Sequence, residues 1–407
     1  MFAVQVGVAL DVNSVGISVG LVSTYPPTEC GIASFSASLR SGMAESRQTS
    51  RGLNVLRLVD DGRDGPGREY VHEHRRGDRE SLKRSIAVLN TYDTVLIQHE
   101  FGIFAGADGD EVLDLTDGVE VPIATTFHTV LDPPSAGQRF VMQTLIDESQ
   151  RVIVMTETAR RRLLRHHDVA PDIVEVISHG VDLRFAGPSL ADADRPVVLT
   201  WGLIGPGKGL EVAIEACVGL TDLEPLPRYV IVGSTHPNIR RVNGEDYRHG
   251  LQAEVQRFGL EEIVEFDGRY LDVETLAALV RSADVVVLPY ASVDQVTSGV
   301  LVEALAAGKP VIATSFPHSI EVLSSGAGSV VAHDDADELS HAIRRVLTDP
   351  DLAARMTREA RHVSRHWWWP EVGRRYLGVL EGMARDVATG LDIVALEDDT
   401  ALDRTTR

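Results

Sequence analysis

The stretch "DVVVLPYASVDQVTSGVLVEALAAGKPVIAT", residues 284–314, contains one α/β unit. A short apolar run ends at Pro289 and a loop follows it. A helix-length apolar segment then begins near Ser298 and stops at Gly308, after which "KPVIAT" starts a second apolar run. A helix between two short apolar runs is typical of parallel sheets. This stretch therefore predicts an α/β fold.

The same alternation runs along the whole chain. Each half contains six short apolar runs, with helix-length amphipathic segments between them. In the first half the runs are "GISVGLVS", "NVLRLV", "DTVLIQH", "PIATTFH", "RVIVM" and "VEVIS". In the second half they are "RPVVLTW", "RYVIVG", "IVEFDG", "DVVVLPY", "KPVIATS" and "GSVVA". This pattern predicts two Rossmann-like, doubly wound parallel sheets joined near residues 187–196.

The length of 407 residues also favours two domains rather than one. We predict an N-terminal domain at 16–190 and a C-terminal domain at 191–365. Residues 1–15 are expected to form an extension, and the acidic segment 391–407 a mobile tail. Polar and glycine residues gather where the apolar runs end. A cleft between the two domains, each presenting its strand ends, would bring these residues together.

Composition excludes several classes of partner. The net charge of −21 would repel nucleic acid and anionic lipid over most of the surface. No apolar segment is long enough for a transmembrane helix, and the N-terminus lacks the basic region of a signal peptide. The two cysteines, Cys30 and Cys217, show no metal-ligand spacing and favour a reducing compartment. These features together predict a cytoplasmic protein.

The helix of the opening stretch predicts an anion site at its start. The backbone N–H groups of Ser298, Gly299, Val300 and Leu301 would point out of the helix, and the helix dipole would add to their attraction for an anion. Glu303 lies four residues after Gly299 and shares its face. A carboxylate there is placed to accept hydrogen bonds from the hydroxyls of a ribose beside a phosphate. An ordinary helix with a solvated Glu is the plain alternative.

A second anion site is indicated by "TWGLIGPGKGLE", residues 200–211. Its Gly202, Gly207 and Lys208 nearly match a P-loop, but Gly209 stands where a P-loop has the Ser or Thr that holds Mg²⁺. A nucleoside triphosphatase is therefore disfavoured. Lys208 and the glycines could still hold phosphate without a metal. Two anion sites and one sugar acceptor together indicate a nucleoside diphosphate sugar.

At this point the chain resembles a known family over nearly its whole length. It is similar to the retaining glycosyltransferases of family 4, which have the GT-B fold of two facing Rossmann-like domains. The matching segments occur in family order: "TYPPTECGIASF", "TTFHTV", "ISHGVDL", "GLIGPGKGLEVAIEA" and "DQVTSGVLVEALAAGKPVIAT". A further segment, "RHWWWPEVGRRYLGVL", resembles the family's helix that crosses back to the N-terminal domain. The resemblance places this crossover helix at 366–390.

The resemblance implies a role for individual residues. Gly31 would let the backbone approach the donor diphosphate, and His128 would contact the donor sugar. Lys208 would neutralise the leaving diphosphate, and Glu303 would hold the ribose. The remaining implied donor contacts are the backbone around Gly268 and Arg269, which would line the base.

Two positions depart from the family pattern. Leu203 stands where the family usually has an Arg after the glycine that opens the phosphate loop, and Gln295 replaces an acidic residue eight positions before Glu303. Gln295 can still hydrogen-bond sugar hydroxyls as donor and acceptor. The loss of the Arg leaves Lys208 and the helix dipoles to hold the diphosphate.

The family mechanism implies front-face displacement with retention and without a metal or cofactor. The acceptor would be a sugar or glycoside hydroxyl, and His99 and Glu100 are candidate acceptor contacts, with a buried strand end as the plain alternative. We expect mannose from GDP-mannose, with a UDP-glucose-type donor as the alternative. A catalytically silent GT-B scaffold also stays open, as does an epimerase or a phosphorylase of the same fold. The protein could form homo-oligomers.

Overall fold

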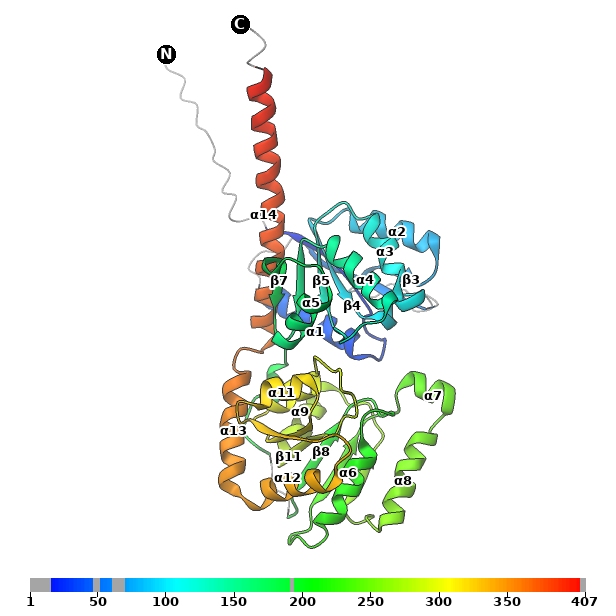
Figure 1. Ribbon diagram of the computed structural model, residues 1–407, viewed down its shortest axis with the longest axis vertical. Helices are drawn as coiled ribbons and strands as arrows, with labels where there is room; N and C mark the ends of the chain where they lie inside the picture. Colours follow the sequence, from blue (N-terminus) through cyan, green and yellow to red (C-terminus); the bar gives the residue numbers. More distant parts are fainter. Residues whose placement is uncertain (1–15, 47–51, 61–69, 191–193, 403–407) are drawn as a thin grey trace.

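The computed structural model describes residues 16–46, 52–60, 70–190 and 194–402, and it contains two parallel sheets with helices on both faces (Figure 1). The first sheet has seven strands in the order β3-β2-β1-β4-β5-β6-β7. The second has six, in the order β10-β9-β8-β11-β12-β13. All strand pairs between the named strands are parallel. The predicted fold class is confirmed.

The first domain alternates strands and helices as the apolar runs predicted. Its elements are β1 (Ser18–Ser23), α1 (Gly31–Glu45), β2 (Gly52–Val59), β3 (Tyr70–Arg75), α2 (Arg79–Leu89), β4 (Thr94–His99), α3 (Glu111–Asp117), β5 (Ile123–Phe127), α4 (Ala136–Asp147), β6 (Arg151–Val154), α5 (Glu157–His166) and β7 (Val174–Val176).

The second domain follows the same plan. Its elements are β8 (Val197–Trp201), α6 (Leu210–Ala216), β9 (Arg228–Val232), α7 (Pro237–Asn243), α8 (Asp246–Phe258), β10 (Val264–Asp267), α9 (Val273–Ser282), β11 (Val285–Leu288), α10 (Gly299–Ala306), β12 (Val311–Thr314), α11 (Pro317–Leu323), β13 (Gly328–Val331), α12 (Ala336–Thr348) and α13 (Pro350–Ser364). The last helix, α14 (Trp369–Leu402), follows α13.

Strand β3 was missed by the sequence analysis, which found six strands in this half. Its sequence, "YVHEHR", is mostly polar because β3 is an edge strand and pairs only with β2. Its polar side chains find partners: Arg57 donates to Glu73 at 3.0 Å, and His74 contacts Ser85 at 3.1 Å. An edge strand satisfied in this way needs no apolar run, so apolar patterning could not reveal it.

Alternation along β8 shows how the second core is built. Leu199 and Trp201 face the apolar layer under α9 and α10, while Val198 faces the layer under α6 and α12. Because both faces are buried, the strand reads as a continuous apolar run. The same alternation places the indole of Trp201 beside α10, where the candidate site lies.

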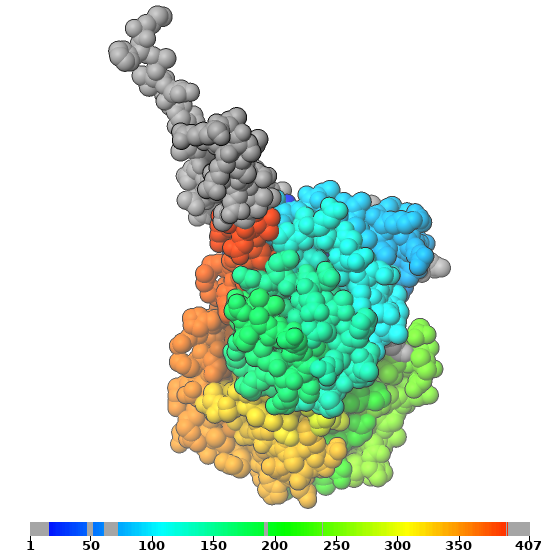
Figure 2. Space-filling view, turned by 45° about the horizontal axis from the view of Figure 1, so that its top comes forward, coloured from blue at the N-terminus to red at the C-terminus, as the bar shows by residue number. Residues whose placement is uncertain are grey.

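The two domains contact each other through segments that follow strand ends. Val296, in the loop after β11, packs into the apolar core of the first domain. Its carbonyl accepts a hydrogen bond from the hydroxyl of Thr156, which follows β6, at 3.1 Å. The carboxylate of Glu321 on α11 accepts from the N–H groups of Glu157 and Thr158 at 2.9 and 2.8 Å, at the start of α5. In the space-filling view the first domain rests directly on the second (Figure 2).

Helix α14 returns from the second domain to the first, where it runs beside α1 (Figure 1). The two helices approach closely at glycines: a Cβ on Gly42 would lie 2.2 Å from the carbonyl oxygen of Trp369, and one on Gly373 would lie 2.4 Å from the backbone of Gly42. Any larger residue at either position would push the helices apart.

Two boundary predictions need comment. The segment 391–407 was expected to be a tail, but α14 continues to Leu402. The acidic composition suggested disorder, yet the segment has no proline and contains three Leu and two Ala, which favour a helix. The predicted extension at 1–15 and residues 403–407 lie outside the described residues. None of the described helices has both the length and the apolar composition to cross a membrane.

Candidate active site

Apart from Gly268 and Arg269, which follow the edge strand β10, the predicted site residues lie at or after the carboxyl ends of inner strands. In the second sheet β8 and β11 are neighbours, and the chain leaves them in opposite directions along the sheet. In the first sheet β1 and β4 have the same relation. Such switch points are where open α/β sheets bind ligands. The glycine loop follows β8, the loop before α10 follows β11, Gly31 follows β1 and Glu100 follows β4.

The glycine loop has a backbone that requires its glycines. Gly209 is the N-cap of α6 with a φ of 63°, and a Cβ there would lie 1.7 Å from the carbonyl oxygen of Pro289. Gly207 has a φ of 88°, and its carbonyl accepts from the N–H of Ala291 at 3.0 Å. These contacts bring the glycine loop against the loop after β11. The ammonium of Lys208 lies 4.3 Å from the centroid of the Tyr290 ring on that second loop.

The start of α10 is more fully hydrogen-bonded than the sequence analysis expected. The N–H of Ser298 donates to Nδ1 of His318 at 2.8 Å, and the N–H of Leu301 donates to the Ser298 hydroxyl at 3.2 Å. Two of the four N–H groups predicted to be free are therefore taken, because Ser298 acts as a normal N-cap and a buried histidine covers it. In the described part of the chain, the N–H groups of Gly299 and Val300 have no acceptor. The candidate anion site is reduced to these two donors.

Glu303 lies one turn into α10 and is partly buried. The indole Nε1 of Trp201 donates to its Oε2 at 3.1 Å. Burial raises the pKa of Glu303 to about 7, and the nearby Asp182 raises it further, while the indole hydrogen bond opposes the rise. A carboxylate that is costly to ionise in the empty site gains most from hydroxyl groups that donate to it.

The first domain contributes His128, at the end of β5. Its Nε2 lies 2.8 Å from Oε1 of Gln98, and its backbone N–H donates to the carbonyl of His99 at 3.0 Å. Burial lowers the pKa of His128 to about 3, so the ring is neutral at physiological pH. Its ring contacts Phe35 edge-on, with 4.8 Å between centroids, and Phe35 contacts His179 in the same way at 5.0 Å.

His99 and Glu100, the two candidate acceptor contacts, have different environments. His99 is fully buried among the rings of Phe101, Phe104 and Phe127, so its side chain cannot reach an acceptor in this structure. All six side chains of β4 are buried, including that of its last residue, so His99 as an acceptor contact stays a prediction that this burial does not favour. Glu100 is partly exposed, and it accepts from the Thr129 hydroxyl and from the N–H of Phe101. Burial raises its pKa.

Gly31 and Gln295, two further predicted donor contacts, lie after β1 and after β11 respectively. Gly31 begins α1 and is exposed, and a Cβ there would meet nothing within 4 Å. A ligand could therefore approach its backbone. Gln295 is partly buried, and its side-chain nitrogen donates to the carbonyl of Thr297 at 3.1 Å. Its side-chain oxygen can therefore accept from a ligand hydroxyl, and the second hydrogen of its side-chain nitrogen can donate to one.

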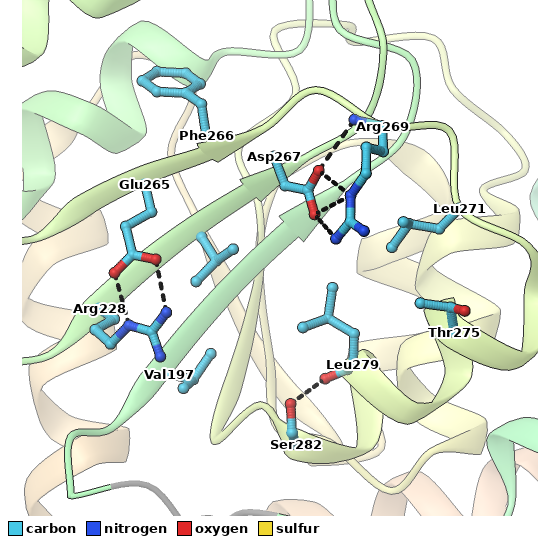
Figure 3. Close-up of a pocket in the computed structure, with 11 residues that line it drawn as sticks. Val197, Arg228, Glu265, Phe266, Asp267, Arg269, Leu271, Thr275, Leu279 and Ser282 are labelled. Carbon is cyan, nitrogen blue, oxygen red and sulfur yellow. Dashed lines mark hydrogen bonds and ion pairs between the residues drawn. The ribbon is translucent and has the colours of Figure 1, made fainter.

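Arg269 and Gly268 lie at the edge of the second sheet, after β10. The Arg269 guanidinium is exposed and binds the carboxylate of Asp267 at 2.6 Å (Figure 3). Asp267 and Arg269 line one end of a hollow of about 290 Å³ between strands β8, β9 and β10 and helix α9. The hollow extends to Val197 and Ser282, near the amino end of β8, and so runs away from the strand ends where the other candidates lie. It is therefore separate from the candidate site.

Two histidines of the site received no role in the sequence analysis. His318 covers the start of α10, and His179 lies so near Gly299 that a Cβ on that glycine would be 3.0 Å from the His179 Nε2. Both follow the carboxyl end of a strand, β12 and β7 respectively. His179 also lies in "ISHGVDL", one of the segments that resemble the family, so this residue had a second signal in the sequence.

Two descriptions of known protein families match the chain. The family description "Glycosyl transferases group 1" matches residues 184–363, and "Glycosyltransferase Family 4" matches residues 46–185. The chain belongs to glycosyltransferase family 4. It is a glycosyltransferase of the GT-B type, and the resemblance found in the sequence is confirmed.

Curated relatives of this family 4 protein include D-inositol 3-phosphate glycosyltransferases. That of Corynebacterium glutamicum is 26% identical over 306 residues, which cover 69% of each chain. That of Streptomyces scabiei is 31% identical over 278 residues, covering 61% of this chain and 60% of the relative.

Solved structures share the fold at low sequence identity. The Anabaena protein Alr3699/HepE, in complex with UDP, has a TM-score of 0.70 and 16% identity, covering 90% of this chain and all of that one. Sucrose-phosphate synthase from Thermosynechococcus elongatus has a TM-score of 0.72 and 20% identity, covering 92% and 99%.

Proposed function

We propose that this protein transfers a hexose from a nucleoside diphosphate sugar to a hydroxyl of a sugar or glycoside, with retention at the anomeric carbon. The observation that carries the proposal is the meeting, at one switch point, of a cation, two open N–H donors and a carboxylate. These groups belong to Lys208, to Gly299 and Val300, and to Glu303. Lys208 and the two N–H donors match the diphosphate of such a donor sugar, and Glu303 matches its ribose.

Each group has one task in this proposal. Lys208 and the two N–H donors hold the diphosphate and stabilise the charge that it gains as it leaves, and stabilisation of this kind is usually the largest single contribution of an enzyme. A charge-assisted hydrogen bond of this kind is worth about 1.5 to 3 kcal/mol. Glu303 accepts from the ribose, and the open backbone at Gly31 lets the diphosphate approach the first domain. No step needs a metal, and metal independence stays a prediction.

The chemistry is a front-face displacement. The acceptor hydroxyl attacks the anomeric carbon from the side on which the diphosphate leaves, and a phosphate oxygen takes the hydroxyl proton. The transition state resembles an oxocarbenium ion. His128, neutral because it is buried, contacts the sugar as a hydrogen-bonding group rather than as a cation. Gln295 and Glu100 bind sugar hydroxyls, of the donor and of the acceptor respectively.

The donor is the least constrained part of the proposal. GDP-mannose stays our prediction from the sequence, but none of the relatives or neighbours above carries mannose in its name. A UDP-sugar is the alternative, favoured by the Anabaena neighbour that was solved with UDP. A phosphorylated cyclitol acceptor, by analogy with the D-inositol 3-phosphate glycosyltransferases, is a further candidate to test.

Calorimetric titration of the full chain with GDP, UDP, ADP and their sugar conjugates, without metal, tests the proposal. We expect one nucleotide to bind, and Lys208→Ala to weaken that binding by about tenfold to a hundredfold. Lys83→Ala is the matched control, because Lys83 is an exposed lysine on α2 that pairs with Glu80. If no nucleotide binds, the enzyme proposal fails, and the silent GT-B scaffold takes its place.

A further inference from the structure

His179 lies at the point where the two domains and the predicted diphosphate meet. It follows β7 in the segment that leads to the second domain. Its ring packs against Phe35 on α1 and Trp369 at the start of α14, with centroid distances of 5.0 and 5.5 Å. On its other side, Nε2 and Cε1 lie 3.0 and 3.1 Å from the place that a Cβ on Gly299 would occupy. The ring therefore presents its Nε2 edge to the first turn of α10.

The protonation of the ring follows from one hydrogen bond. Nδ1 of His179 lies 2.6 Å from the carbonyl oxygen of Gly180. A carbonyl can only accept, so Nδ1 carries the hydrogen. In the neutral ring Nε2 then has a lone pair and no hydrogen. A lone pair beside the open N–H groups of α10 would repel a phosphate oxygen, whereas a protonated Nε2 would donate to it.

The groups that face His179 leave it neutral when the site is empty. They are aromatic rings, a glycine and two neutral histidines, namely Phe35, Trp369, Gly299, His128 and His318. In its own segment, Asp182 is engaged by Arg184 at 2.6 Å. Burial lowers the pKa of His179 to about 4, and the hydrogen bond to Gly180 only partly opposes this. A bound diphosphate would be the first strong anion beside the ring.

We propose that His179 takes up a proton when the nucleoside diphosphate binds, and that its Nε2–H then donates to the diphosphate from the first domain. This inference rests on the proposed function. It gives the diphosphate a second cation besides Lys208, supplied by the opposite domain, so that binding of the donor also holds the two domains together.

The inference fixes the sign of a pH effect. In the free protein His179 is unprotonated above pH 5. In the complex with nucleotide the pKa of His179 is higher, so the ring stays protonated up to that higher pKa. Between these values the complex holds one more proton than the free protein, so affinity falls about tenfold for each unit that pH rises. Ionisation of Glu303 and of the terminal phosphate also changes with pH, but a substitution at His179 leaves these contributions in place. The difference between the two proteins isolates His179.

The experiment is calorimetric titration of the full chain with UDP and with GDP from pH 6 to 8.5. Wild type is compared with His179→Gln, whose amide can donate but never ionises. Each titration is repeated in two buffers of different ionisation enthalpy, which gives the protons taken up. His167→Gln is the control, because His167 is a buried histidine at the end of α5 whose pKa burial also lowers to about 4, and no role in the site is given to it.

We expect wild type and His167→Gln to take up about one proton more than His179→Gln, and to lose affinity more steeply as pH rises. If a nucleotide binds and all three proteins take up equal numbers of protons, the inference is wrong while the proposed function stands. If neither nucleotide binds wild type, both fail. If His179→Gln does not fold, the inference is tested by the proton uptake of wild type above pH 7, where Glu303 is largely ionised. If wild type takes up no proton at those pH values, the inference is wrong.

Discussion

Replacement of Glu303 by Gln should stabilise the empty protein at high pH. The folded protein holds the carboxyl of Glu303 partly buried, with the Trp201 indole as its hydrogen-bond donor. A glutamine oxygen can accept the same bond, so the substitution removes the charge and little else. Burial raises the pKa of Glu303 from 4.5 to about 7, which means that ionisation opposes folding.

The sign and the size follow from linkage. Below pH 4.5 the carboxyl is protonated in both the folded and the unfolded chain, so it costs nothing. Between pH 4.5 and 7 the folded chain holds more protons than the unfolded chain, and stability falls as pH rises. Above pH 7 the full penalty is present, at most about 3 to 4 kcal/mol, because the pKa rises from 4.5 to about 7 and one pKa unit is worth about 1.36 kcal/mol. Partial exposure screens the charge, so we expect about 1 to 3 kcal/mol.

The assay is urea denaturation of wild type and Glu303→Gln, without nucleotide, at pH 5 and pH 8. We expect the variant's advantage in free energy of unfolding to be small at pH 5 and about 1 to 3 kcal/mol at pH 8. Glu100→Gln is measured alongside, because the pKa of Glu100 is raised by the same cause at another strand end. If the advantage of Glu303→Gln is the same at both pH values, Glu303 is not held in a site that opposes its ionisation.

Three further substitutions test other parts of the site. Gly209→Ala should lower the thermal unfolding temperature and abolish nucleotide binding, because the new Cβ would lie 1.7 Å from the carbonyl oxygen of Pro289. Gly205→Ala in the same loop is the control. The nearest atom to its Cβ would be 3.4 Å away, so both the unfolding temperature and nucleotide binding should stay unchanged. Glu100→Gln should raise the KM for the acceptor about tenfold and leave donor affinity unchanged. The measurement is a steady-state assay at saturating donor. An unchanged KM for the acceptor would exclude Glu100 from the acceptor site. Arg269→Ala should change calorimetric donor affinity less than threefold, since the exposed guanidinium binds Asp267, and a larger loss would mean that the side chain reaches the nucleotide.

The fold was predictable because its strands are buried on both faces. A strand such as β11, with four buried aliphatic residues, has an apolar run that cannot be confused with a surface segment. The same rule failed for β3, whose partners at the sheet edge are polar. It also could not give the end of α14, because an acidic composition indicates solvent exposure and does not distinguish a helix from a disordered tail.

Positions in the site were predictable where the backbone dictates them. The glycines at 207 and 209 have positive φ, and Ser298 caps α10, as their residue types indicated. Which side chains face the ligand was harder to predict. His99 and Glu100 are adjacent in the sequence, yet one is enclosed by phenylalanines and the other meets Thr129. This difference depends on how loops after β4 and β5 pack together, which a single sequence does not show.

The start of α10 shows why the second domain alone does not complete the site. Ser298 and Leu301 have partners within this domain, so only the N–H groups of Gly299 and Val300 remain for a ligand. A side chain at position 299 would press on His179, which comes from the first domain. Gly299 is therefore required by the contact between the domains as well as by an approaching phosphate. A change in the angle between the domains would move His179 relative to the two open donors. We infer that donor affinity depends on domain position through this contact.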